Sequence, residues 1–144
     1  MARAALDGAR IEGHCRMVRA SEVQPDDLLA ASGYVFCCPE NLATMSGEMK
    51  EFFDRTYYPL LGRIEGRAYA TMIAAGLDGT GAERQIDRIV TGWRLRRVAD
   101  PLILRTGAQT PEAILAPKTV AADPLGECHN LGQSLSGGIA LGIF

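Results

Sequence analysis

The chain has 144 residues, of which 47% are hydrophobic and 22% charged, and it carries a net charge of −2. A chain of this length can bury a sizeable core, so we expect a single folded domain over residues 1–144. The slightly acidic balance excludes the basic surface that nucleic-acid binding requires. Because no apolar segment is long enough for a membrane span or a secretory signal, we expect no membrane partner and a cytoplasmic location.

The cysteines show neither a CxxC spacing nor the paired spacing of a zinc site. They are Cys15, Cys37, Cys38 and Cys128. A reducing compartment leaves them as thiols, and the adjacent Cys37 and Cys38 lie too close together for an unstrained disulfide. We therefore interpret all four as small core residues and expect no metal site.

The first part of the chain predicts a helix, a strand and a second helix. Residues 2–10 have high helix propensity. Residues 14–19 alternate apolar and polar side chains, which predicts a short strand near a sheet edge. Pro25 then opens a short helix that ends before Gly33.

A buried strand and a long helix follow. Residues 34–38, Tyr-Val-Phe-Cys-Cys, form an unbroken apolar run that is typical of a central parallel strand covered on both faces. After a connecting loop, apolar residues recur at helical spacing from Met45 to Leu60. Ser46 is the expected N-cap of this helix.

The next unit repeats the order of strand and helix. Residues 67–75 predict a strand that ends in a turn at Gly76. Thr80 and Glu83 have the spacing of a capping box, in which each side chain satisfies a backbone donor at the start of a helix.

The last third predicts one more strand and a final helix. Residues 101–104 favour a strand, residues 106–122 an irregular excursion, and Asp123 the N-cap of the last helix. Alternating strands and helices predict a doubly wound parallel sheet in three αβα layers. Ligands bind such sheets beyond the carboxyl ends of the strands, which selects the loops at 39–46 and 76–80.

Residues 33–58 resemble the flavodoxin-like NAD(P)H-dependent FMN reductases. The resemblance rests on Pro39-Glu40-Asn41 after the strand and on the run Met45-Ser46-Gly47-Glu48-Met49-Lys50-Glu51-Phe52-Phe53-Asp54-Arg55 at the start of the helix. A second match covers residues 74–81, which look like the family's other flavin-side loop. The resemblance implies a flavodoxin-like fold, FMN as cofactor, NAD(P)H or a quinone as further small-molecule partners, and an oxidoreductase function.

The resemblance also implies a set of cofactor-binding residues and no catalytic side chain, because the flavin itself transfers the hydride or electrons. The implied residues are Pro39, Glu40, Asn41, Leu42, Met45, Ser46, Gly76, Asp78 and Gly79. The same residues also fit an ordinary connection between a strand and a helix, with Pro and Asn forming a turn and the glycines opening a capped helix.

The chain departs from the family at its start, where members have a buried strand and a Ser/Thr/Gly-rich loop that binds the FMN phosphate. Residues 2–10 look instead like the second half of the family's first helix, so the N-terminus resembles a truncated one. In strand order 2-1-3-4-5, the missing first strand lies between residues 14–19 and residues 34–38. We expect these two strands to close up, or a second chain to repair the sheet in a homo-oligomer.

Two functions remain open from the sequence. The first is an FMN-dependent oxidoreductase whose flavin binding is weakened or lost with the phosphate loop. The second is a cofactor-free flavodoxin-like domain that acts as a binding or oligomerisation module.

Overall fold

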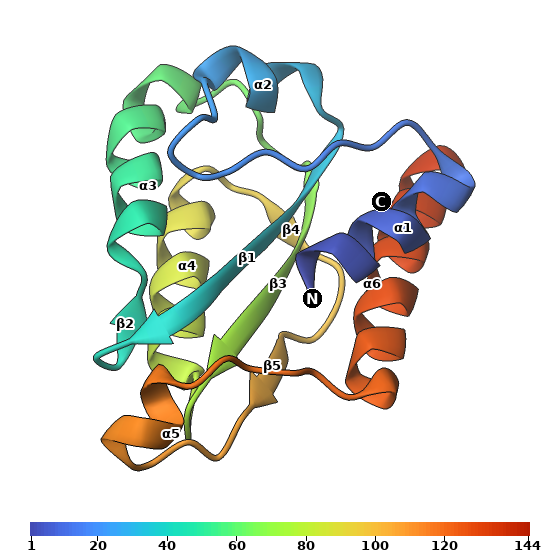
Figure 1. Ribbon diagram of the computed structural model, residues 1–144. Coiled ribbons are helices and arrows are strands. Elements are labelled where there is room, and N and C mark those ends of the chain that lie inside the picture. The colour runs from blue at the N-terminus through green and yellow to red at the C-terminus, as the bar shows by residue number, and fades with distance from the viewer.

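The computed structural model describes residues 1–144 as one sheet with helices on both sides (Figure 1). Its elements are α1 (Ala2–Glu12), α2 (Pro25–Ala30), β1 (Gly33–Asn41), β2 (Thr44–Met45), α3 (Gly47–Leu60), β3 (Ala68–Ala75), α4 (Thr80–Gly92), β4 (Arg96–Arg97), β5 (Leu102–Arg105), α5 (Pro111–Leu115) and α6 (Ala122–Ala140). Helices α3 and α4 cover one face of the sheet, and α1 and α6 cover the other (Figure 1). The predicted three αβα layers are therefore confirmed. None of the helices is long and apolar enough to cross a membrane.

The sheet is parallel apart from the short strand β2, and β3 lies at its centre. The strand order is β2-β1-β3-β4, with β5 also paired to β3. Strand β1 runs parallel to β3 from Gly33, which lies opposite Ala68, to Pro39, which lies opposite Ala74. On its other side β1 contacts only β2, at Glu40 and Asn41. Strand β1 thus lies inside the sheet, between β2 and β3, as the sequence predicts, although residues 34–38 pair only with β3.

Residues 14–19 do not form the predicted strand. A strand needs a neighbour for its backbone groups, and no backbone hydrogen bond joins this segment to β1. The segment is fixed by contacts outside the sheet: Arg10 Nε donates to the Cys15 carbonyl at 3.3 Å, and Arg16 pairs with Asp27 at 2.6 Å. The expected closing up of the two strands is thus wrong as well.

Two further features differ from the sequence-based expectation. The excursion at 106–122 contains the short helix α5, which Thr110 caps by accepting a hydrogen bond from the Ala113 amide at 3.2 Å. Helix α6 begins at Ala122, before the predicted N-cap Asp123. These differences move element ends but leave the layers unchanged.

Aromatic side chains fill the core between the sheet and α3 and α4. Phe36 of β1 lies 5.4 Å from Phe53 between ring centroids, and Phe53 lies 5.5 Å from Trp93. Trp93 is completely buried, and its indole Nε1 donates to the Tyr57 carbonyl at 2.9 Å. The amphipathic spacing of α3 and α4 thus places their apolar faces together against β1 and β3.

Thr71 in β3 has a buried hydroxyl without any hydrogen-bond partner. An unpaired buried hydroxyl destabilises a fold by about 1–3 kcal/mol, and valine has nearly the same shape without the polar atom. We expect Thr71→Val to raise the free energy of unfolding by about 1 kcal/mol in urea denaturation. Thr71→Ser, which keeps the hydroxyl and removes the methyl group, should lower it. A loss of stability in Thr71→Val would mean that the hydroxyl has a partner.

Helix α1 packs closely against α6 through two glycines. A Cβ at Gly132 would lie 1.9 Å from the Ala5 carbonyl oxygen, and a Cβ at Gly8 would lie 2.0 Å from the His129 carbonyl oxygen. Only glycine permits such an approach of two helix backbones. The first helix is therefore firmly part of the fold.

Candidate functional site

The predicted loop after β1 is a tight hairpin. Glu40 pairs with Met45 and Asn41 with Thr44, so that Leu42 and Ala43 form the turn. Both turn residues have positive φ, 52° and 60°, which is the turn geometry that favours Asn-Gly. Left-handed backbone at residues other than glycine costs about 1 kcal/mol or more and concentrates at functional sites. This strained turn presents Leu42 almost fully to solvent, with 99% of its surface exposed.

The Glu40 carboxylate joins the two predicted loops. Its Oε1 accepts a hydrogen bond from the Gly79 amide at 2.8 Å, and its Oε2 accepts one from the Ala82 amide at 3.0 Å. These amides are at the amino end of α4, where a negative charge is favourable. Glu40 therefore caps α4 from the neighbouring strand and holds the β1 hairpin against the turn after β3.

The predicted capping box of α4 does not form, because this carboxylate takes its place. The N-cap is Gly79, with φ 87°, and no side chain of α4 caps the helix. Thr80 instead donates to Asp78 Oδ2 at 2.5 Å. Local spacing suggested Thr80 and Glu83, but the partner of the helix amides lies some forty residues earlier in the chain.

Two contacts that sequence reasoning missed tighten the same junction. The Met45 amide donates to Gln85 Oε1 at 2.9 Å, which links the hairpin to α4 a second time. A Cβ at Gly81 would lie 2.1 Å from the Ala43 carbonyl oxygen, so the turn packs directly on the helix. The sequence shows the cluster of glycines at 76, 79 and 81, but it does not indicate which segment of the chain packs against them.

The predicted site residues fall into two groups. Glu40, Met45, Ser46 and Gly79 hold the scaffold: Met45 and Gly79 are buried, and the Ser46 hydroxyl caps α3 by accepting from the Met49 amide at 3.4 Å. The other group lies at the surface of the two loops, and its members are Pro39, Asn41, Leu42, Asp78 and the partly exposed Gly76. The exposed Leu77, which the sequence did not single out, lies in the same turn as Asp78. The surface between the loops is therefore built from main chain, a proline, one amide, one carboxylate and two leucines.

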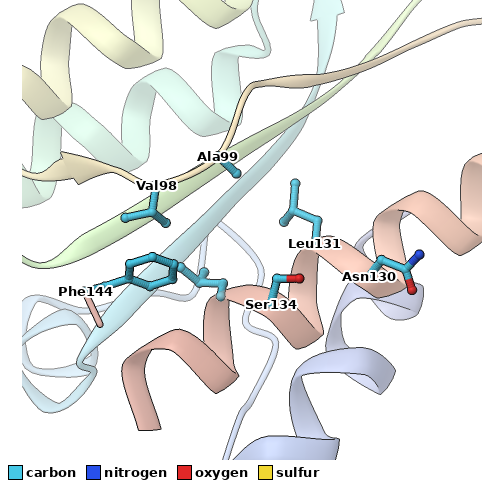
Figure 2. A pocket seen from close by; sticks show the side chains of 7 residues that line it. Val98, Ala99, Asn130, Leu131, Ser134 and Phe144 are labelled. Carbon is cyan, nitrogen blue, oxygen red and sulfur yellow. The ribbon is translucent and has the colours of Figure 1, made fainter. Parts of the chain in front are cut away.

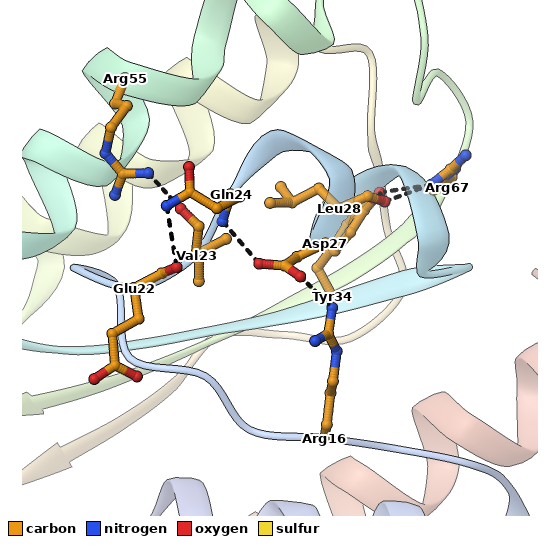
Figure 3. Close-up of polar contacts among 9 residues, drawn as sticks. All are labelled: Arg16, Glu22, Val23, Gln24, Asp27, Leu28, Tyr34, Arg55 and Arg67. Carbon is orange, nitrogen blue, oxygen red and sulfur yellow. Dashed lines mark hydrogen bonds and ion pairs between the residues drawn. The ribbon is translucent and has the colours of Figure 1, made fainter.

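Arg55 of α3 and Arg67 just before β3 have structural roles at the other end of the sheet. Arg55 pairs with Glu51 at 2.9 Å and donates to the Ala20 carbonyl at 3.1 Å. It also donates to the Val23 carbonyl (Figure 3). Arg67 donates to the Leu28 carbonyl at 2.6 Å (Figure 3). Arg55 fixes the connection from α1 to α2 and Arg67 fixes the end of α2, so neither side chain is available to a ligand at the loops.

The amino end of α1 does not supply an anion-binding loop among residues 1–144. Its N-cap is Met1, which makes no side-chain capping bond, and the helix starts beside Cys37 of β1. Burial, as the largest effect, raises the pKa of the Cys37 thiol to about 11 and also raises the pKa of Cys38 and Cys128. All four cysteines are free, as expected, and these three remain protonated at neutral pH.

A small cavity of about 200 Å³ lies away from the candidate site (Figure 2). It is lined by Val98, Ala99, Asn130, Leu131, Ser134, Leu135 and Phe144. These residues come from the connection between β4 and β5, from α6 and from the C-terminus, and none belongs to the two loops. The cavity therefore has no part in the site built around Glu40.

Comparison with known proteins relates the chain to flavodoxins. No family model matches it. It is 29% identical over 157 residues to a flavodoxin of Aquifex aeolicus (strain VF5), and the match covers 98% of this chain and 80% of that protein. The structure of a flavodoxin from the domain Archaea superposes with a TM-score of 0.77 and 18% identity, covering 96% of this chain and 87% of that one. An NADH:FMN oxidoreductase in its apo form superposes with a TM-score of 0.63 and 15% identity, covering 94% and 78%.

These similarities establish the fold. The flavodoxin-like α/β fold predicted from the sequence is confirmed, and the sheet has five strands. The carboxyl ends of β1 and β3, where Glu40 joins the two loops, form the edge at which such sheets bind ligands.

Proposed function

We propose that this protein binds a flavin through the two loops at 39–46 and 76–80 and acts as an oxidoreductase of the NAD(P)H-dependent FMN or quinone reductase type. When bound, the flavin supplies hydride and single-electron transfer. The chain's own residues bind and orient the ring: the exposed main chain of the hairpin offers amides and carbonyls, and Leu42 and Leu77 offer apolar contact.

The observation that carries the proposal is the pair of hydrogen bonds that the Glu40 carboxylate accepts from the Gly79 and Ala82 amides. It helps to hold the two loops side by side, and a preformed site binds with a smaller loss of conformational entropy. The strained turn at Leu42 and Ala43 supports the same reading, because such strain persists where the surroundings impose it and often marks a binding site.

The residues fit the ring of the cofactor better than its phosphate. Charge-assisted hydrogen bonds to a phosphate contribute about 1.5–3 kcal/mol each, and the start of α1 offers no capping hydroxyl to make them. We therefore propose that residues 1–144 hold a flavin through its ring, so that a protein of these residues should bind riboflavin nearly as well as FMN.

Fluorescence titration tests this directly. Riboflavin and FMN should both be quenched in a saturable way, with dissociation constants within about threefold of each other, a difference of less than 1 kcal/mol. Absence of quenching by either ligand would overturn the proposal. An FMN affinity greater than that of riboflavin by about 100-fold or more would show a phosphate site and overturn the ring-only account.

The second candidate function is a cofactor-free module for oligomerisation or binding. The free edge of β1 favours it, because that edge carries main-chain groups with no partner among the residues of the chain. A protein that ignores both flavins yet associates through this edge would have this function instead.

A further inference from the structure

Helix α5 lies in a stretch of chain that no other element covers. All residues from 109 to 119 are exposed, and α5 has no buried residue. Two neighbouring side chains of this helix are large and apolar: Ile114 is 58% exposed and Leu115 is 84% exposed. Because the removal of apolar surface from water is favourable, these two side chains are suited to contact a bound molecule.

Polar contacts within the segment, rather than packing, hold α5 in its helical form. At its amino end, the Thr110 hydroxyl accepts a hydrogen bond from the Ala113 amide. At its carboxyl end, Lys118 Nζ donates to the carbonyls of Ala113, at 2.6 Å, and Ile114, at 2.9 Å. A helix this short has little stability from propensity alone, so these caps keep Ile114 and Leu115 side by side on the surface.

The start of this segment is tied to the second loop of the candidate site. The Thr106 amide donates to the Ala75 carbonyl at 2.9 Å, and the Gly107 amide donates to the Gly76 carbonyl at 2.8 Å. The pairing of β3 with β5 thus continues beyond both strands into the turn after β3. A Cβ at Gly76 would lie 3.2 Å from the Ala108 carbonyl oxygen. Helix α5 therefore lies at the carboxyl end of the sheet, together with the two loops (Figure 1).

Three separate segments carry exposed apolar side chains at this end of the sheet. Leu42 in the hairpin is 99% exposed, Leu77 after β3 is 57% exposed, and α5 adds its two apolar residues. Small-molecule sites are lined mostly by apolar side chains, while a few polar groups fix the orientation of the ligand. The exposed main chain of the two loops offers such polar groups, and the three segments offer the apolar lining.

We propose that Ile114 and Leu115 contact the flavin ring, so that α5 forms a third, apolar wall of the site at loops 39–46 and 76–80. This inference rests on the flavin binding proposed above. No residue from 109 to 119 is buried, so α5 loses no packed contact when it lies against a bound ring. Its two side chains replace water on the apolar part of the ring, and the main chain of the loops binds the polar edge.

The size of this apolar surface favours a small planar ring over a protein partner. A stable protein interface buries about 800 Å² on each partner and uses about 20–30 residues a side. Segment 109–119 contributes only two large apolar side chains. That is little for a protein interface, but it suffices to cover part of one ring system.

Riboflavin titration of the wild-type protein and of two double variants tests the proposal. Ile114→Ser combined with Leu115→Ser removes the apolar surface of α5 and should weaken riboflavin binding by about tenfold or more. The matched control, Leu141→Ser combined with Ile143→Ser, removes two exposed apolar side chains outside the loops and should change the dissociation constant by less than about twofold. Because all four side chains are exposed, both double variants should keep the wild-type midpoint of thermal denaturation.

Hydrogen exchange of the unaltered protein gives a second readout, which does not depend on whether the serine variant keeps α5 folded. At saturating riboflavin, the amides of Ile114 and Leu115 should exchange more slowly than in the free protein. The amide of Leu141, at the end of α6, should exchange at the same rate in both states.

The outcomes separate this inference from the proposed function. Equal riboflavin affinity of the wild type and the α5 variant, an equal loss in both double variants, or unchanged exchange in α5 would overturn the inference and leave flavin binding at the two loops intact. Absence of quenching by the wild-type protein would overturn the proposed function, and this inference with it.

Discussion

Replacing Glu40 with alanine is expected to lower the free energy of unfolding by about 3 kcal/mol and to weaken flavin binding by about tenfold or more. The carboxylate makes charge-assisted hydrogen bonds to the amides of Gly79 and Ala82, and each such bond contributes about 1.5–3 kcal/mol. Without it, the amino end of α4 loses its cap and the two loops lose their strongest link. Urea denaturation and riboflavin titration measure the two effects.

Two variants separate the role of Glu40 from a general loss of negative charge. Glu40→Gln keeps one acceptor oxygen and should lie between wild type and Glu40→Ala in both measurements. Glu22→Ala removes an exposed loop carboxylate that has no side-chain partner and should change stability by less than about 0.5 kcal/mol. The account of the loops fails if Glu40→Ala is as stable as Glu22→Ala.

Adding one methyl group at Gly132 is expected to destabilise the fold by about 1–2 kcal/mol. Its Cβ would lie 1.9 Å from the Ala5 carbonyl oxygen, and both atoms belong to helix backbones that cannot move aside cheaply. The resulting overpacking costs about 1–3 kcal/mol and outweighs the gain of about 1 kcal/mol in helix propensity from glycine to alanine. Thermal denaturation should show a clearly lower midpoint for Gly132→Ala.

Gly126 provides the matched control in the same helix, because a Cβ there meets nothing within 4 Å. Gly126→Ala should therefore stabilise the protein by up to about 1 kcal/mol, through helix propensity alone. The two substitutions are chemically identical and should have opposite signs. Destabilisation of both by equal amounts would contradict the close packing of α1 on α6.

The sequence predicted the layers of the fold because periodicity reports which side of an element is buried. The helical spacing of apolar residues from Met45 to Leu60 and the apolar run at 34–38 both reflect burial that the structure bears out. The prediction of a strand at residues 14–19 was wrong. The alternation of apolar and polar side chains describes a single segment, whereas a strand forms only when a neighbouring strand pairs with it. Its pattern alone could not show that no neighbouring strand is available.

The sequence could predict which two loops form the candidate site, but not which contacts hold these loops together. Strand order places the ends of β1 and β3 together, so loops 39–46 and 76–80 could be selected from the chain alone. The role of Glu40 could not be found this way, because its partners at Gly79 and Ala82 are far along the sequence and are main-chain amides without a side-chain signature. For the same reason the local capping box at Thr80 was the better guess and was wrong.

The central claim, that the loops joined by Glu40 hold a flavin ring, is tested most directly by riboflavin titration of the 15N-labelled protein. The account predicts that the largest amide shifts fall at residues 39–46 and 76–80 and that they saturate together. Shifts concentrated at the cavity beside Val98 and Leu131, or no shifts at all, would contradict it.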